Sequence, residues 1–330
     1  MLKIIQYLLL CTVIVIAGEK PLLTIYTYDS FTAEWGAGPR VKEAFEKEHN
    51  VTLKFVGLPS SIGALRKIQL EGKRTKADIL LGLDTSIAQV AKKTGLFLPH
   101  GLNTSKLRLP VPYSDDTFVP FDYSYFAFVY DEKKVKHPPT SFDALVAMPK
   151  DFKIVIQDPR SSTSGLGLLL WIKEIYGEKA GEYWNRLAPH ILTITKGWSE
   201  SYGLFLKGEA DMVFSYTTSP AYHMIEEKRS NIKAASFTEG HYGQIEVAAI
   251  VRSSKNQALA KKFLSFMRSS TFADIIPTTN WAYPVVKTQK GLPKAFGQLV
   301  VPSKMLLMDG KDVEANRKAY IDEWLDAIRK

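Results

Sequence analysis

An alternation of short β-rich runs with longer amphipathic stretches limits the folds open to this chain of 330 residues. Apolar and β-branched residues predict strands at 22–26, 52–56 and 78–81. Between these runs, apolar residues recur at helical spacing, which predicts helices at 39–48 and 62–70. Strands that alternate with helices in this way are typical of α/β folds with a largely parallel sheet.

One run is too long and too β-rich to be an ordinary edge strand. Residues 118–130 predict a strand that crosses between two lobes, and residues 246–251 predict its return. Two lobes joined by crossing strands form a hinge. The remaining strands and helices are predicted at 153–156, 165–176, 178–187, 212–215, 258–267 and 313–328. We predict a two-lobed α/β fold with crossing hinge strands, in which lobe 1 comprises 19–121 and 245–330 and lobe 2 comprises 122–244.

Residues 1–18 have the features of a cleaved secretory signal peptide. Lys3 precedes an apolar run at 4–16, and the small pair Ala17-Gly18 follows it. The apolar run is shorter than the about 20 residues that span a bilayer. The single cysteine, Cys11, lies inside this segment, so the mature chain would carry no thiol and would depend on a large core for stability. The segment predicts export to the periplasm.

The charge distribution argues against nucleic acid as a partner. The formal net charge is +9, but the basic residues are scattered along the chain. No basic stripe interleaves with aromatic residues, as a nucleic-acid channel requires. A solvated basic surface is the better interpretation, and the sequence predicts neither a cofactor nor a metal site.

Hydroxyl side chains gather where predicted strands end and helices begin. The carboxyl ends of strands in an open α/β sheet form the binding crevice, so these segments are expected to meet at one cleft. Helix starts attract anions, phosphate above all. Plain helix capping is the alternative, because Ser and Thr are preferred caps. The candidate residues are Ser60, Ser61, Ser162, Thr163, Thr217 and Ser219.

A second group consists of aromatic residues at turn-like or strand-end positions. Core packing is the common fate of any one aromatic side chain, but a group beside acidic residues suits a flat cationic ring. Each cation–π contact contributes about 0.5–2 kcal/mol. The aromatic residues are Tyr26, Tyr28, Trp35, Trp198, Tyr216, Tyr222, Trp281 and Tyr283, and the acidic residues are Asp29, Asp122 and Glu200.

Several of these segments resemble the periplasmic thiamine-binding proteins of thiamine ABC importers. The resemblance rests on stretches such as Tyr-Thr-Tyr-Asp-Ser-Phe at 26–31, Gln-Asp-Pro-Arg at 157–160, Ser-Tyr-Thr-Thr-Ser-Pro-Ala-Tyr-His at 215–223 and Asn-Trp-Ala-Tyr-Pro at 280–284. It implies a bilobal "Venus flytrap" that binds thiamine and its mono- and diphosphate. It also implies an inner-membrane ABC permease with its ATPase as partner.

The resemblance assigns ligand contacts by position in the matching motifs. The loop Ser60-Ser61 corresponds to another contact, although family members carry an acidic residue and a glycine there, so its role stays open. Tyr28, Trp35, Tyr222 and Trp281 are implied as ring contacts. The remaining implied contacts are Ser162, Thr163, Trp198, Tyr216, Thr217, Thr218 and Ser219.

Three alternatives come from other classes. A thiamine-degrading transferase is similar to this fold but needs a nucleophilic cysteine, and Cys11 would leave with the signal. A serine hydrolase would need a His and an acid around one Ser, and no nucleophile-elbow pattern surrounds Ser219 or His223. A ferric-ion or polyamine carrier of the same architecture is the third alternative; iron carriers use neighbouring tyrosines, and polyamine would leave the hydroxyl clusters without a purpose.

Overall fold

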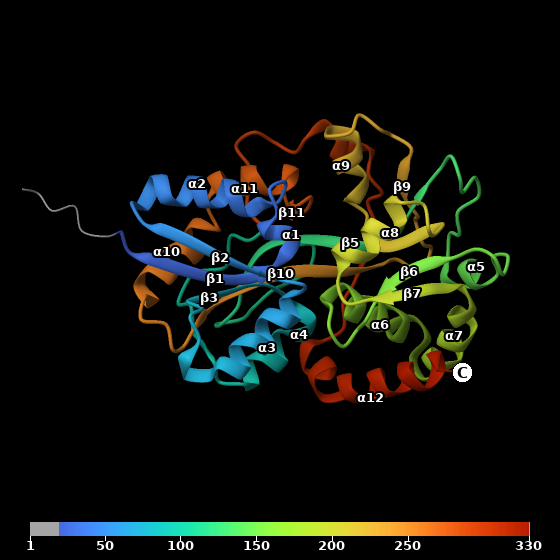
Figure 1. Ribbon diagram of the computed structural model, residues 1–330, viewed down its shortest axis with the longest axis horizontal. Coiled ribbons are helices and arrows are strands. Elements are labelled where there is room, and N and C mark those ends of the chain that lie inside the picture. Colours follow the sequence, from blue (N-terminus) through green and yellow to red (C-terminus); the bar gives the residue numbers. More distant parts are fainter. Residues whose placement is uncertain (1–19, 330) are drawn as a thin grey trace, which may run out of the picture.

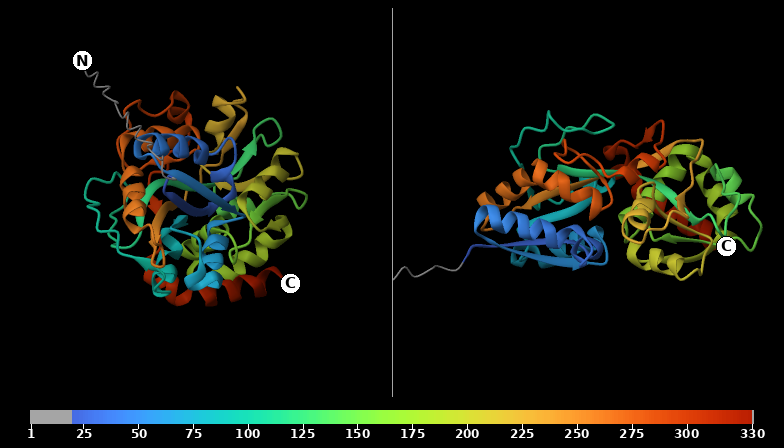
Figure 2. Two further views of the ribbon diagram at one scale, coloured as in Figure 1. Left: turned by 60° about the vertical axis from the view of Figure 1, so that its left-hand side comes forward. Right: turned by 90° about the horizontal axis from the view of Figure 1, so that it is seen from above.

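A computed structural model of the protein describes residues 20–329 and shows two α/β halves side by side (Figure 1 and Figure 2). The predicted signal peptide, residues 1–18, lies outside the described residues. None of the helices within 20–329 combines the length and the apolar character that crossing a membrane requires.

The first half contains a parallel sheet, as predicted. Strand β1 pairs in parallel with β2 and β3. Strand β3 is buried along its whole length, as expected for a parallel strand that is covered on both faces. The elements are β1 (Leu22–Tyr28), α2 (Ala37–His49), β2 (Thr52–Leu58), α3 (Ser61–Glu71), β3 (Ile79–Asp84) and α4 (Thr85–Lys93).

Two long antiparallel strands join the halves, which confirms the predicted crossing. Strand β5 (Val119–Asp131) pairs with β10 (His241–Val251) through residues 119–125. Beyond residue 125, β5 pairs instead with β8 (Met212–Tyr216) of the second half. The strand order is β2-β1-β3-β10-β5-β8-β6-β7. Strand β10 begins five residues before the predicted return strand, so more of it lies between the halves.

The second half places helices around β6, β7 and β8. Strand β6 pairs in parallel with both β7 and β8. The elements are β6 (Ile154–Gln157), α6 (Thr163–Tyr176), α7 (Ala180–Leu187), β7 (Ile191–Thr195), α8 (Trp198–Leu206) and α9 (Ser219–Ile225). The apolar patterns of β7, α8, α9 and α4 are short, so these elements could not be predicted from the sequence.

The C-terminal helix α12 (Gly310–Ile328) packs on both α4 and α7, and therefore contacts both halves (Figure 1). The lobe boundaries at 121/122 and 244/245 stay a prediction. The remaining helices are α1 (Asp29–Thr32), α5 (Phe142–Val146), α10 (Gln257–Phe266) and α11 (Ser270–Ile275). The short strands are β4 (Phe97–Leu98), β9 (Ile232–Ala234), β11 (Tyr283–Pro284) and β12 (Met305–Leu306).

Large apolar side chains fill both halves, and the helix–sheet contact in the second half depends on a glycine. Phe126 of β5 is fully buried and stacks on Phe214, with ring centroids 5.1 Å apart. Gly167 of α6 lies against the Phe126 ring so closely that an added Cβ would overlap it. Burial of a phenylalanine contributes about 1.5–3 kcal/mol, so this packing matters for stability.

We expect Gly167→Ala to lower the free energy of unfolding by about 1–3 kcal/mol, because the new methyl group must displace Phe126. The matched control is Gly203→Ala on α8, where an added Cβ meets nothing within 4 Å. The control should be neutral or more stable by up to about 1 kcal/mol, since Ala favours helix over Gly. Thermal and urea unfolding followed by circular dichroism measure both variants. Equal stability of the two would contradict this account of the packing.

Candidate functional site

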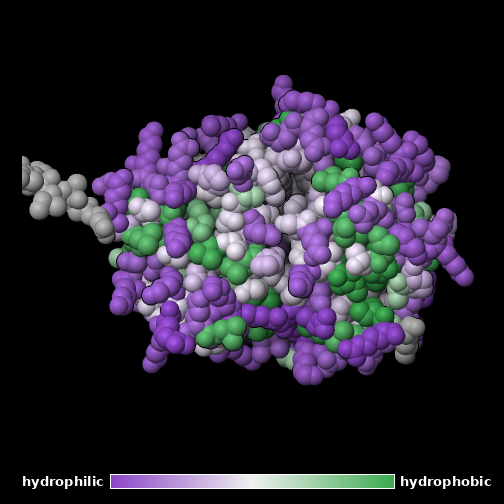
Figure 3. All heavy atoms as spheres, in the orientation of Figure 1, coloured by the Kyte–Doolittle hydropathy of each residue, from purple (hydrophilic) through white to green (hydrophobic). Residues whose placement is uncertain are grey.

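A cavity of about 280 Å³ lies between the two halves, with β5 and β10 at its floor. In the space-filling view, a hollow opens between the halves, among residues of intermediate hydropathy (Figure 3). The implied ligand contacts, with one exception, line this cavity together with two of the three acidic residues: Tyr28, Asp29, Trp35, Ser60, Ser61, Asp122, Ser162, Thr163, Trp198, Tyr216, Thr218, Ser219, Tyr222 and Trp281. Their roles as ligand contacts stay a prediction.

Thr217 is the exception, and its placement corrects the prediction. Its side chain is fully buried outside the cavity lining. Its backbone N–H donates to the Tyr125 carbonyl at 2.9 Å and so continues the pairing of β8 with β5. Its neighbours Tyr216 and Thr218 both face the cavity. Side chains alternate along extended backbone, so Thr217 points the other way.

Three members of the predicted aromatic and acidic group also lie elsewhere. Tyr26 is in the middle of β1 with its ring in the core, and its hydroxyl donates to Glu71 at 3.1 Å. Tyr283 stacks on Tyr123 outside the cavity. Glu200 is exposed on α8 and does not line the cavity.

Aromatic side chains from separate elements form the walls. Trp198 begins α8 and stacks on Tyr202, with ring centroids 4.8 Å apart and planes inclined at 24°. Its indole N–H donates to Ser215 at 2.7 Å, which fixes the ring. The Tyr216 ring lies 6.4 Å from the Trp198 ring. Trp198 is therefore a helix residue, not the predicted turn residue, and the first turn of α8 directs its ring at the cavity.

A second aromatic pair that lines the cavity comes from two distant segments. Tyr222 of α9 meets Trp281 edge to face, with ring centroids 5.3 Å apart. Like Trp198, Tyr222 is a helix residue rather than a turn residue. Trp281 has a φ of +54°, which is strained for a bulky side chain, and its indole N–H is buried without an acceptor. Backbone strain of this kind concentrates at functional sites.

The hydroxyl residues include true helix caps, as the alternative interpretation proposed. Ser60 accepts a hydrogen bond from the Gly63 N–H at 3.0 Å, and Ser162 accepts one from the Gly165 N–H at 3.4 Å. The Ser60 hydroxyl also donates to the Ser161 carbonyl across the two halves. The N-termini of α3 and α6 therefore meet at the boundary between the halves, where helix dipoles favour negative charge.

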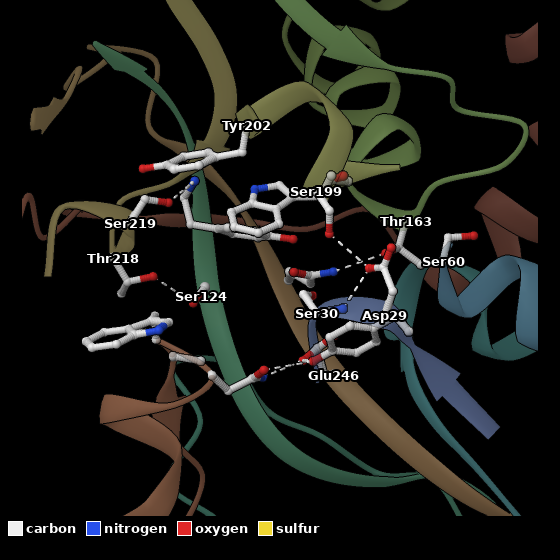
Figure 4. A pocket seen from close by; sticks show the side chains of 18 of the residues that line it. Asp29, Ser30, Ser60, Ser124, Thr163, Ser199, Tyr202, Thr218, Ser219 and Glu246 are labelled. Carbon is white, nitrogen blue, oxygen red and sulfur yellow. Dashed lines mark hydrogen bonds between the residues drawn. The ribbon is translucent and has the colours of Figure 1, made fainter. Parts of the chain in front are cut away.

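Further hydrogen bonds connect the halves at the rim of the cavity. Ser199 at the start of α8 donates to the Asp29 carboxylate at 2.9 Å (Figure 4). The Arg66 guanidinium donates to the Arg160 carbonyl at 2.8 Å. These contacts hold the two halves together around the cavity.

Two buried carboxyl groups form part of the floor. Asp122 of β5 is 1% exposed and Glu246 of β10 is 8% exposed. Burial raises the pKa of Asp122 to about 7 and the pKa of Glu246 well above its usual range. Within residues 20–329, the cavity is lined by these two groups and Asp29, and by no Lys, Arg or His. Such a lining attracts cations.

Several lining residues are not among those predicted from the sequence. The sequence contains an indication that Glu246 is a site residue, because it is a charged residue directly before the apolar run 247–251. Another indication concerns Tyr202, since it follows Trp198 by one helical turn. Asn280 stands next to Trp281 in the stretch Asn-Trp-Ala-Tyr-Pro at 280–284, which carries part of the family resemblance. The others are of residue types that are common in strands, helices and loops and carry no distinctive signal: Ser30, Pro59, Ser124, Ser164, Ser199, Gly203, Leu206, Gln244, Thr279 and Ala282.

The alternatives to small-molecule binding find little support in the geometry. His223 bonds to Tyr202 and Glu227, both at 2.8 Å, while the Ser219 hydroxyl bonds to Ser215, so no Ser–His pair forms there. In the part of the chain that the structure describes, no three His, Cys, Asp or Glu side chains are arranged to hold a metal ion.

Comparison with known proteins agrees with this architecture. Residues 28–272 match the sequence profile of the bacterial extracellular solute-binding proteins. The chain belongs to this family.

Within the family, the chain is similar to proteins named for thiamine. It is 51% identical to the thiamine-binding periplasmic protein of Escherichia coli K12 over 99% of both chains. It is 42% identical to the protein of the same name from Haemophilus influenzae, over 96% of this chain and 95% of that one. A solved periplasmic thiamin binding protein superposes with a TM-score of 0.92 at 51% identity, covering 94% of this chain and 98% of that one.

More distant structures share only the fold. The ferric binding protein from Campylobacter jejuni superposes with a TM-score of 0.73 at 18% identity, covering 92% of this chain and 99% of that one. The two-lobed fold is thus common to carriers of different ligands, and the ligand must be argued from the cavity.

Proposed function

We propose that this protein is the periplasmic substrate-binding component of an ABC importer and that it captures thiamine between its two halves. The observation that carries the proposal is the cavity itself, which combines aromatic walls with three carboxyl groups and has no basic lining residue within 20–329. A flat cationic heterocycle satisfies both features, by stacking and by charge. The similarity to proteins named for thiamine binding supports this choice.

The mechanism we propose is a shift in the population of closed molecules. The open form admits the ligand, and closure buries it against the aromatic side chains that line the cavity, among them Trp198, Tyr216, Tyr222 and Trp281. A ligand shifts this balance only by its extra affinity for the closed form. An inner-membrane permease with its ATPase would recognise the surface of the closed form. In this proposal the protein is a carrier without cofactor or catalytic residue, and a polyamine is the rival ligand.

Mass spectrometry of the protein purified without refolding gives a first test of the ligand. A tightly bound vitamin should co-purify and appear at the mass of thiamine or of a thiamine phosphate. A polyamine mass in its place would support the rival ligand.

We expect Trp198→Ala and Tyr216→Ala each to weaken thiamine binding about 2- to 30-fold, the equivalent of one lost ring contact. The control is Tyr320→Ala on α12, a half-buried ring outside the cavity, which should leave the affinity unchanged. Titration calorimetry measures the affinities, and circular dichroism checks that the variants fold. Unchanged affinity in both cavity variants would defeat the assignment of this wall.

Thiamine phosphates form a second ligand class, and the meeting of two helix N-termini favours them. The amides in the first turn of α3 and α6 have no partners within their helices, and phosphate binds such groups. Asp29 stands at the same rim and opposes negative charge there. We propose that the phosphate of an ester lies beside Ser162 and Thr163.

Under this proposal, Ser162→Ala and Thr163→Ala should each reduce the affinity for thiamine monophosphate more than the affinity for thiamine. The control is Ser141→Ala, which removes the same kind of cap from α5, outside the cavity, where Ser141 accepts from Ala144 at 2.9 Å. Calorimetric titration with both ligands gives the ratio of affinities. A ratio that stays the same in the two cavity variants would rule out this phosphate position.

A further inference from the structure

The two floor carboxyl groups are direct neighbours in the sheet. Asp122 of β5 and Glu246 of β10 are partners in the antiparallel ladder, where opposed side chains lie close together. Asn280 donates to Asp122 at 2.6 Å and to Glu246 at 3.1 Å. Tyr28 donates to Glu246 at 2.8 Å. These donors do not satisfy all the oxygen atoms of the two carboxyl groups, because Asp122 Oδ1 is buried and accepts no hydrogen bond from an amide or hydroxyl.

The pair is held without a compensating positive charge. The groups that act on either carboxyl are Tyr28, Asn280 and the other carboxyl, with no basic side chain among them in the described chain. Two opposed carboxylates in a buried site repel each other strongly. A proton on one of the two carboxyl groups removes this repulsion, and the buried Asp122 Oδ1 has no other partner that would compete for it.

The surrounding groups favour this proton. Tyr28 on β1 and Tyr216 on β8 both have a pKa well above the usual range, because they are buried and lie near the carboxyl groups, so they stay neutral. Asp84 at the end of β3 is the ladder partner of Glu246 on its other side, and burial raises its pKa to about 7. Every ionisable group packed around the pair is therefore neutral or negative, and the proton belongs to the pair as a unit.

We propose that Asp122 and Glu246 act as a proton-exchanging counter-ion, so that capture of a cationic ligand at the cavity floor releases their shared proton to solvent. One positive charge enters and one proton leaves, which keeps the net charge of the buried floor constant. The inference rests on the proposed function, because it takes the permanently charged thiazolium ring of thiamine as the occupant.

The proposal sets the direction of the pH dependence. The proton is bound in the free protein and lost in the complex, so the affinity rises with pH while the free pair still holds it. Burial raises the pKa of both carboxyl groups, that of Asp122 to about 7 and that of Glu246 well above its usual range, so the affinity should still be rising at neutral pH. Full release of one proton corresponds to an increase in affinity of up to about tenfold per pH unit.

The experiment is calorimetric titration of the full protein with thiamine at pH 7 in phosphate and in Tris, which differ in ionisation enthalpy. The difference in apparent enthalpy between the two buffers should report release of a substantial fraction of one proton.

Asp122→Asn should still fold and bind thiamine more weakly, with little proton release and a flatter pH profile. Glu246→Gln is the second variant and should also lose the release. The control, Asp143→Asn, changes an exposed carboxylate on α5 and should release the proton as the unmodified protein does.

The possible results distinguish a failure of this inference from a failure of the proposed function. Thiamine binding without proton release, or release that persists in both Asp122→Asn and Glu246→Gln, overturns the inference and leaves the proposed function intact. No detectable thiamine binding by the unmodified protein overturns both.

Discussion

The antiparallel pairing of β5 with β10 is the constraint on which the rest of the site depends. Each strand enters both halves, so the backbone that joins the halves also forms the cavity floor. The ladder sets Asp122 opposite Glu246, and the strand ends place the walls to either side. Two buried carboxyl groups on central strands reduce stability, since neither has a basic partner in the described chain. A ligand that supplies the missing positive charge explains why such strands carry them.

Hydrogen bonds across the rim favour the closed arrangement of the two halves, and a bound ligand adds to them. The hydrogen bonds from Ser199 to Asp29 and from Arg66 to Arg160 cross between the halves. Such bonds contribute about 0.5–1.5 kcal/mol each, or about 1.5–3 kcal/mol where one group is charged. A shift from mostly open to mostly closed molecules requires about 5.5 kcal/mol. A ligand that contacts both walls adds to the free energy of these hydrogen bonds, which is how a carrier links binding to closure.

Much of the fold could be predicted from the sequence, because alternating strands and helices and one overlong strand leave few architectures. The site could be predicted where a residue type is unusual for its position, as with Trp281 or Asp122. The prediction failed where the direction of a side chain depends on local backbone geometry. Thr217 stands among cavity residues in the sequence, but side chains alternate along extended backbone, and its own side chain points away from the cavity. Trp198 was predicted as a ligand contact, but the helix α8 that directs its ring toward the cavity was not predicted. Glu246 escaped notice because its partner, Asp122, lies 124 residues away in the sequence and is brought opposite only by the strand pairing.

The central claim is that a flat cation is held between aromatic side chains from both halves and over the carboxyl pair. A crystal structure of the protein with thiamine measures this directly. The account predicts the thiazolium ring within about 6 Å of the wall ring centroids, a distance at which cation–π attraction is significant. It also predicts that a carboxyl oxygen of Asp122 or Glu246 faces that ring. A ligand bound outside the halves, or a thiazolium ring directed away from both the aromatic walls and the carboxyl pair, would contradict it.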